Sequence, residues 1–432
     1  MSSSTIETAG SKPSPALAHL PIAQVDVAQP ALFESDEILP VFARLRREAP
    51  VHYCAESQFG AYWSITRHAD IMKVDTDPVT FSSAVENGGV HIDDRIMRDA
   101  KGTFEYKGFI AKDPPEHGKY RKAVQPIVSA ESLNKLRVLI QQRTAKVLDS
   151  LPVNEDFDWV ERVSVELTTL MMVTMFDVPP KDGRRLTYWS DMMGASQGSD
   201  GFVSHEHRIQ QLGECLDYFT AILKERANEP PRFDLVSMLA HDAHTRNLKP
   251  MDFLGQIMLL IVGSNDTTRN SMSASINCLN LFPDESRKLW VNPSQIDNMV
   301  KEVVRWQTPI AHQRRTAMQD TRIGDTDIPK GAKVIMWYLS GNRDETVFAD
   351  PDVIRFDRAN VNQHLSFGFG IHRCMGLRLA ELQLRVLWEE LLARFDGVEL
   401  VAPAKRTRAI ARNGYKELMV RLKPRRSARR CL

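Results

Sequence analysis

Several features are scarce in this chain of 432 residues, and each scarcity excludes a class of protein. The five cysteines are an odd number and form no C-x-x-C pair, which argues against a disulfide framework or a zinc site and fits a reducing cytoplasm. The formal net charge is only +1, so bulk charge indicates neither nucleic-acid nor membrane binding. No G-x-G-x-x-G fingerprint occurs, so the sequence offers no flavin or nicotinamide domain.

Long apolar runs are also missing. The longest strongly apolar run, residues 257–262, is far too short to span a bilayer, and the N-terminus lacks the basic and apolar regions of a signal peptide. We therefore expect a soluble, cytoplasmic protein. The composition of residues 1–21 and the basic charge of residues 423–432 predict disordered tails around a single domain over residues 22–422.

Apolar periodicity predicts a mainly α-helical domain with small β-sheets. Helices are expected at 32–49, from 70, over most of 116–233 with breaks at the prolines, and at 251–282, 294–307 and 376–395. Strands are expected as a hairpin within 52–66, at 322–328 and 332–338, and within 398–422. The irregular, polar segment 82–108 is typical of a binding loop.

Cys374 is the most informative residue. Residues 367–376 read FGFGIHRCMG and lie just before the predicted helix 376–395. The helix dipole and the free N–H groups at this position should stabilise a thiolate and lower the pKa of Cys374. A thiolate is a strong axial ligand for haem iron. A buried, inert cysteine is the usual alternative, but the fixed spacing of Phe, Gly, His and Cys argues against it.

Three further segments carry polar side chains at helical spacing. Glu302 and Arg305 lie three residues apart and can form an ion pair, and His117 and Arg121 share a helix face after two prolines. Within the apolar helix 251–282, Thr267 can bond the carbonyl of Gly263 and bend the helix. Taken alone, each of the first two pairs can be an ordinary surface pair. The Thr267–Gly263 pair can be a helix kink whose polar groups bond only to each other.

Taken together and in this order, these segments resemble the cytochrome P450 superfamily. The cysteine loop matches its pattern F-x-x-G-x-[HR]-x-C-x-G, and the helix motif matches [AG]-G-x-[DE]-T at Gly263, Asp266 and Thr267, with Ser264 and Asn265 between them. The resemblance runs from about residue 22 to 422. It implies the cytochrome P450 fold, with haem b held between the long central helix and the helix after the cysteine loop.

The resemblance also implies roles for individual residues. Cys374 is expected to be the iron ligand, and Asp266 and Thr267 to deliver protons to iron-bound dioxygen. Arg358 is expected to join Glu302 and Arg305 in a buried structural network. The expected haem-binding set is Phe367, Gly370, His372, Cys374, Gly376, His117, Arg121 and Arg315, with Arg314 competing with Arg315 for a propionate. The expected substrate-binding set is Leu259, Val262, Gly263 and Ile310.

Closer resemblance, in residues 260–272, 305–309, 336–344 and 372–376, points to the soluble bacterial branch that hydroxylates medium-chain n-alkanes at the terminal carbon. It implies a monooxygenase of alkanes or fatty acids that receives electrons from a ferredoxin and its reductase. Arg373 and Arg378 are candidates for contacting that partner. A hydroxylase of terpenoids or steroids is the main alternative. A peroxygenase and a haem sensor are further alternatives, against which Asp266 and Thr267 argue.

Overall fold

The computed structural model describes Leu17 and residues 20–97 and 105–425. Residues 1–16 and 426–432, which make up most of the two predicted tails, lie outside the described part, as do residues 98–104 of the predicted loop. Leu17 and Leu20 pack against a buried apolar cluster, and the last strand ends at Pro424, two residues beyond the predicted domain boundary.

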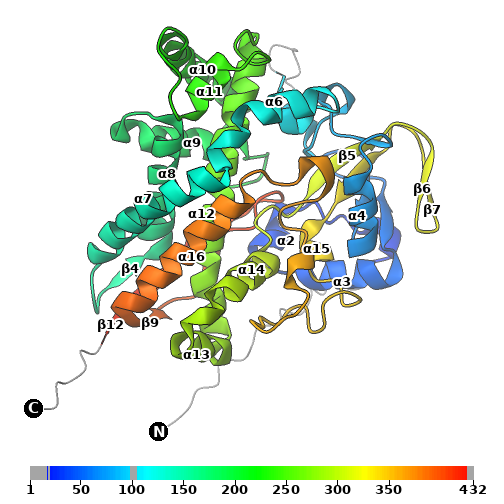
Figure 1. Ribbon diagram of the computed structural model, residues 1–432. Coiled ribbons are helices and arrows are strands. Elements are labelled where there is room, and N and C mark those ends of the chain that lie inside the picture. Colours follow the sequence, from blue (N-terminus) through cyan, green and yellow to red (C-terminus); the bar gives the residue numbers. More distant parts are fainter. Residues whose placement is uncertain (1–16, 18–19, 98–104, 426–432) are drawn as a thin grey trace, which may run out of the picture.

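Helices make up most of the described chain, which confirms the predicted fold class. The long helix α12 (Pro250–Leu281) runs through the helical part and contacts α8, α9, α14 and α16 (Figure 1). The helices are α2 (Pro30–Glu34), α3 (Ile38–Glu48), α4 (His68–Thr76), α5 (Asp94–Met97), α6 (Glu116–Val124), α7 (Ala130–Asp149), α8 (Glu166–Phe176), α9 (Gly183–Met193), α10 (His205–Ala227), α11 (Leu235–His241), α13 (Pro283–Val291), α14 (Ile296–Gln307), α15 (Tyr338–Gly341) and α16 (Leu377–Arg394).

Local sequence explains where several of these helices begin. Pro250 occupies the first turn of α12, where its missing N–H group is not needed. The side chains of Ser129, Ser204 and Asp234 accept hydrogen bonds from the first-turn N–H groups of α7, α10 and α11. These caps fix where α7, α10 and α11 begin.

The strands form four small sheets. The largest has the order β1-β2-β8-β5-β3, in which β1 and β2 form the predicted hairpin and β2 pairs with β8 in parallel. The strands are β1 (Val51–Cys54), β2 (Tyr62–Ile65), β3 (Phe81–Ser82), β4 (Asp156–Asp158), β5 (Gln313–Ala317), β6 (Thr321–Ile323), β7 (Thr326–Ile328), β8 (Lys333–Met336), β9 (Phe395–Leu400), β10 (Lys405–Arg406), β11 (Tyr415–Glu417) and β12 (Met419–Pro424).

Two sequence predictions of elements were wrong. The expected helix 32–49 is two helices, because Asp36 has φ +58° and a left-handed residue cannot continue an α-helix. The expected strand 322–328 is the β6–β7 hairpin, which turns at Gly324 with φ +56°. Among the described residues, no helix is long and apolar enough to cross a membrane.

Candidate functional site

The cysteine loop is shaped by its glycines. Gly368 and Gly370 have φ +63° and +64°, and a Cβ atom on Gly370 would lie 2.5 Å from the backbone oxygen of Asp75 in α4. Only glycine adopts this conformation at so close an approach. The N–H group of Cys374 donates to the carbonyl of Phe367 at 2.8 Å, which closes the loop just before α16 begins.

The electrostatics of Cys374 differ from the sequence prediction. Burial raises the pKa of this thiol above its ordinary value, while the N–H groups of Gly376 and Leu377 and the charge of Arg121 lower it. Burial outweighs the helix N-terminus, so the predicted lowering of the pKa of Cys374 was wrong. A cation beside the sulfur, such as haem iron, favours the thiolate form.

Cys374 opens into an internal cavity of about 260 Å³. The cavity wall gathers sequence-predicted residues from distant elements. Of the predicted residues, those on the wall are His117, Arg121, Leu259, Val262, Gly263, Thr267, Ile310, Phe367, His372, Cys374 and Gly376. Gly370 is not on the wall and shapes the loop instead.

Two histidines on this wall lie side by side. The rings of His117 and His372 are 4.4 Å apart, and His117 Nε2 and His372 Nδ1 are buried with no hydrogen-bond partner among the described residues. Burial, followed by nearby arginines, lowers the pKa of His117 to about 4 and that of His372 to about 2. Unpaired buried donors beside Arg121 on the same wall are suited to an anionic group.

This arrangement fits haem b. The group needs one axial ligand, a flat apolar space and donors for two propionates, and the cavity offers Cys374, an apolar wall, and His117, Arg121 and His372. Among the described residues there is no group of three or more His, Cys, Asp or Glu side chains that could hold a bare metal ion.

Arg315 and Arg314 lie off the cavity wall. Arg315 Nη2 donates to Asp75 Oδ1 at 2.8 Å, and Arg314 forms an ion pair with Asp94. These carboxylates come from elements 220–240 residues earlier in the chain, so no local sequence signal indicated the two ion pairs. Arg315 is close enough to lower the pKa values of both His117 and His372, and its contact with a propionate stays a prediction.

The adjacent residues Asp266 and Thr267 of α12 lie in different surroundings. Thr267 lies on the cavity wall, and its Oγ1 donates to the carbonyl of Gly263 at 3.4 Å. Asp266 is only 1% exposed and lies off that wall, where it accepts from Arg269 at 2.5 Å and from Arg412 at 2.8 Å. Burial raises the pKa of Asp266, and the two arginines oppose that shift. Sequence reasoning missed Arg412 because it lies 146 residues away.

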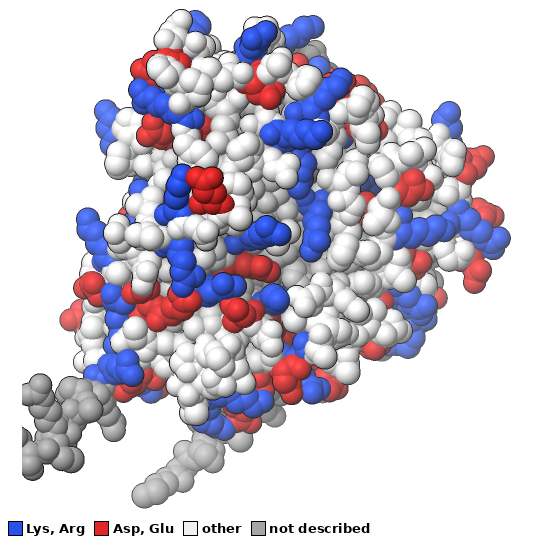
Figure 2. Space-filling model, viewed as in Figure 1, with Lys and Arg blue, Asp and Glu red and all other residues white. Residues whose placement is uncertain are grey.

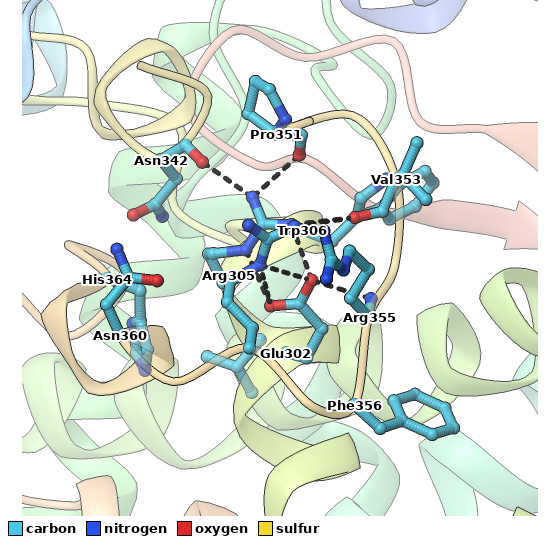
Figure 3. A network of polar contacts seen from close by, with 12 residues as sticks. Glu302, Arg305, Trp306, Asn342, Pro351, Val353, Arg355, Phe356, Asn360 and His364 are labelled. Atoms are coloured by element: carbon cyan, nitrogen blue, oxygen red, sulfur yellow. Dashed lines mark hydrogen bonds and ion pairs between the residues drawn. The ribbon is translucent and has the colours of Figure 1, made fainter. Parts of the chain in front are cut away.

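The buried network of Glu302 has the geometry that the sequence predicted. Arg305 Nε and Nη2 each donate to Glu302 at 2.8 Å (Figure 3). Arg358 Nε also donates to Glu302, at 3.0 Å. The network is joined to the cysteine loop through Ser366, whose hydroxyl donates to the carbonyl of Val304 at 2.8 Å. Ser366 therefore holds the loop against α14, whereas Glu302, Arg305 and Arg358 themselves lie off the cavity wall.

Comparisons with known proteins agree with this site. Residues 295–412 match the cytochrome P450 family. Linalool 8-monooxygenase of Pseudomonas putida is 37% identical over 408 residues, which cover 92% of this chain and 99% of that protein. The structure of cytochrome P450-153 from Novosphingobium aromaticivorans is 40% identical, with a TM-score of 0.85 and coverage of 92% and 99%. That of CYP153D17 from Sphingomonas sp. PAMC 26605 is 42% identical, with a TM-score of 0.87 and coverage of 92% and 98%.

Proposed function

Because the chain belongs to the cytochrome P450 family of haem-thiolate monooxygenases, we propose that it hydroxylates the terminal carbon of medium-chain n-alkanes or fatty acids. The reaction is R–CH3 + O2 + 2e⁻ + 2H⁺ → R–CH2OH + H2O. Haem b, when bound, supplies the activation of dioxygen. The resemblance to the soluble bacterial alkane-hydroxylating branch agrees with the two cytochrome P450-153 matches.

The observation that carries this proposal is the apolar wall of the cavity. Leu259 and Val262 of α12 and Ile310 after α14 line the same space as Cys374. The only charged or titratable side chains on the described wall besides Cys374 and Tyr338 are His117, Arg121 and His372, which suit the propionates. Such a wall binds a hydrocarbon chain by burial, at about 25 cal/mol per Å² of apolar surface.

The protein supplies a ligand, anchors and a proton donor. Cys374 is the proposed iron ligand, and His117, Arg121 and His372 are the proposed propionate donors. The hydroxyl of Thr267 lies on the cavity wall, where it can hold a proton-bearing water. Asp266 can exchange protons with that water only if its carboxylate leaves Arg269 and Arg412.

One comparison favours a second candidate substrate class. Linalool 8-monooxygenase acts on a terpenoid by its name, so a terpenoid hydroxylase is the second proposal. Position 8 of linalool is a methyl group at the end of the carbon chain. Both proposals therefore place the oxidised atom at a chain end, and they differ in whether the rest of the substrate is linear or branched.

An optical titration of the ferric holoenzyme separates the two proposals. Octane, dodecanoic acid, linalool and limonene are added in turn while the Soret band is followed. A shift to high spin with octane or dodecanoic acid, followed by terminal alcohol in a reconstituted assay, supports the first proposal. A shift with terpenoids alone overturns it. Ile310→Ala should change the product pattern, whereas Ile209→Ala, on the outer surface of α10, should not.

Electrons are proposed to come from a ferredoxin and its reductase. Arg373 and Arg378 are exposed next to Cys374, and acidic and basic side chains are interspersed over the face that carries α16 (Figure 2). An acidic partner held by such arginines should reduce the enzyme more slowly as salt rises. Arg378→Ala should weaken that salt dependence, and an unchanged salt slope argues against this contact.

A further inference from the structure

Two aspartates share two arginines behind the cavity wall. Arg269 of α12 is paired with Asp266 at 2.5 Å and with Asp191, near the end of α9, at 2.7 Å. Arg412, between β10 and β11, is paired with Asp266 at 2.8 Å and with Asp191 at 3.5 Å. Its Nη2 also donates to the main-chain carbonyl of Asp191. Each arginine therefore contacts both carboxylates, and two positive charges balance two negative ones.

The two aspartates lie at different depths. The Asp266 side chain is 1% exposed, and the next residue, Thr267, is on the cavity wall. The Asp191 side chain is 40% exposed, so water reaches its carboxylate. The four side chains thus connect the solvent beside α9 with the residue that precedes the proposed proton donor of the cavity.

Two further charged side chains lie close to this network. Glu161 lies near Arg269, and Arg208 lies near Arg412. Glu161 is itself paired with Arg184 at 2.9 Å, on the exposed side of α9. Among the described residues, the two shared arginines are therefore the ion-pair partners of the two aspartates.

The network controls whether Asp266 can carry a proton. Burial raises the pKa of Asp266, Arg412 and Arg269 lower it, and the negative charge of Asp191 raises it again. The two carboxylates are close enough to share a hydrogen bond when one of them is protonated. A guanidinium keeps its protons, so the carboxylates are the groups of the network that can exchange one.

The arginines also resist any movement of Asp266. A turn of its side chain toward the cavity takes a carboxylate away from two guanidinium groups whose side chains are only 13% and 10% exposed. Leaving a buried charge without a partner is strongly unfavourable. Asp191 removes this obstacle, because it stays on both arginines when Asp266 turns away.

We propose that Asp191 is a positioning residue for proton delivery by Asp266. A proton taken from solvent by the Asp191 carboxylate passes to Asp266, and Asp191 is left as the carboxylate that holds both arginines. The neutral Asp266 side chain then turns toward Thr267 and gives the proton to a water in the cavity, after which its carboxylate returns to the arginines. This inference rests on the proposed function, to which it adds a residue of α9.

Infrared titration of the ferric holoenzyme tests the first step without substrate or electron donor. The carboxylic C=O band that is lost in Asp266→Asn reports the protonation of this residue. Asp191→Asn should move the appearance of that band to a pH about 1 lower, because the opposing negative charge is lost. Asp191→Glu keeps the charge and should restore the native titration. Asp149→Asn, which removes an aspartate 2.7 Å from Arg394, is the matched control and should move nothing.

The yield of hydroxylated product per electron pair tests the second step. It is measured with whichever of octane, dodecanoic acid and linalool the native protein hydroxylates. Asp191→Asn should lower the yield about tenfold and increase the solvent isotope effect, while the Soret shift on substrate binding stays unchanged. Removing one arginine as well, in the double variant Asp191→Asn/Arg269→Gln, restores the charge balance around Asp266 and should recover most of the yield.

The outcomes separate this inference from the proposed function. A carboxyl band that does not move in Asp191→Asn overturns the role of Asp191, and so does a yield that falls further in the double variant, as a purely structural ion pair predicts. A native yield in Asp266→Asn overturns the delivery step itself. If the native protein hydroxylates none of the three substrates, the proposed function fails, and the infrared titration alone decides the role of Asp191.

Discussion

Replacing Glu302 by glutamine should destabilise the protein strongly, although Glu302 lies off the cavity wall. Glu302 and Arg305 are both fully buried, and Arg358 is nearly so. The carboxylate receives four charge-assisted contacts from these arginines at 2.8–3.2 Å and a further bond from the N–H group of Arg355 at 3.1 Å. Glutamine has a similar shape, but it removes the only charge that balances two buried guanidinium groups within this network.

Removing one partner of a buried ion pair costs about 3–5 kcal/mol. An unfolding entropy of about 2.1 cal/mol/K per residue, over about 400 residues, converts 1 kcal/mol into about 1.2 °C of thermal midpoint. The expected fall for Glu302→Gln is therefore about 4–6 °C. Because Ser366 connects α14 to the cysteine loop, haem loss should accompany unfolding.

The assay follows circular dichroism and the Soret band together during heating of the holoenzyme. Glu131→Gln is the matched control, because Glu131 is an exposed helix residue whose ion pair with Lys135 is also exposed. Its midpoint should equal that of the native protein, since exposed ion pairs contribute little. A Glu302→Gln midpoint within 1 °C of the native value refutes the reasoning, because the buried charges would then be balanced elsewhere.

Three further predictions concern the cavity, the loop and pH. Thr267→Ala should lower the amount of hydroxylated product formed per electron pair by about 10²-fold, and Thr267→Ser should restore it. An equal product yield in the two variants contradicts the role of the hydroxyl. Gly370→Ala should reduce haem content through its clash with Asp75, while Gly118→Ala, which meets no neighbour, should not. Burial lowers the pKa values of His312 and His364 to about 3 from the ordinary value of 6.5. Below pH 6.5 the unfolded chain therefore binds protons that the folded protein does not, and the free energy of unfolding falls. Denaturant unfolding should show about 1.4 kcal/mol lost per histidine at pH 5.5, and a flat profile between pH 7.5 and 5.5 contradicts it.

Much of the fold could be predicted from the sequence because its signals are local. Proline and capping residues mark the helix starts, and the long apolar periodicity of residues 251–282 indicated α12 to within one residue at each end. The errors occurred where one residue reverses the chain. Asp36 and Gly324 adopt left-handed conformations. The residues around them do not exclude a continuous helix at Asp36 or a continuous strand at Gly324.

Strand β5 was missed because its residues, Gln313–Ala317, include two arginines and are not apolar in alternation. Their burial depends on distant partners, since Arg314 is paired with Asp94 and Arg315 with Asp75. A single sequence carries no record of such pairs.

The different outcomes for Thr267 and Asp266 follow from helix geometry. Residues three or four apart share a helix face, so His117 and Arg121 on the cavity wall and the Thr267–Gly263 bond could be anticipated from spacing. Adjacent residues are rotated by about 100°, so one can line a cavity while the next is buried behind it. Spacing therefore predicted which pairs meet, and it could not predict that Asp266 would be held by Arg412. Arg269 and Arg412 stabilise the charged form of Asp266 and so oppose its protonation. The proposed proton delivery by Asp266 therefore requires its carboxylate to leave these two arginines first.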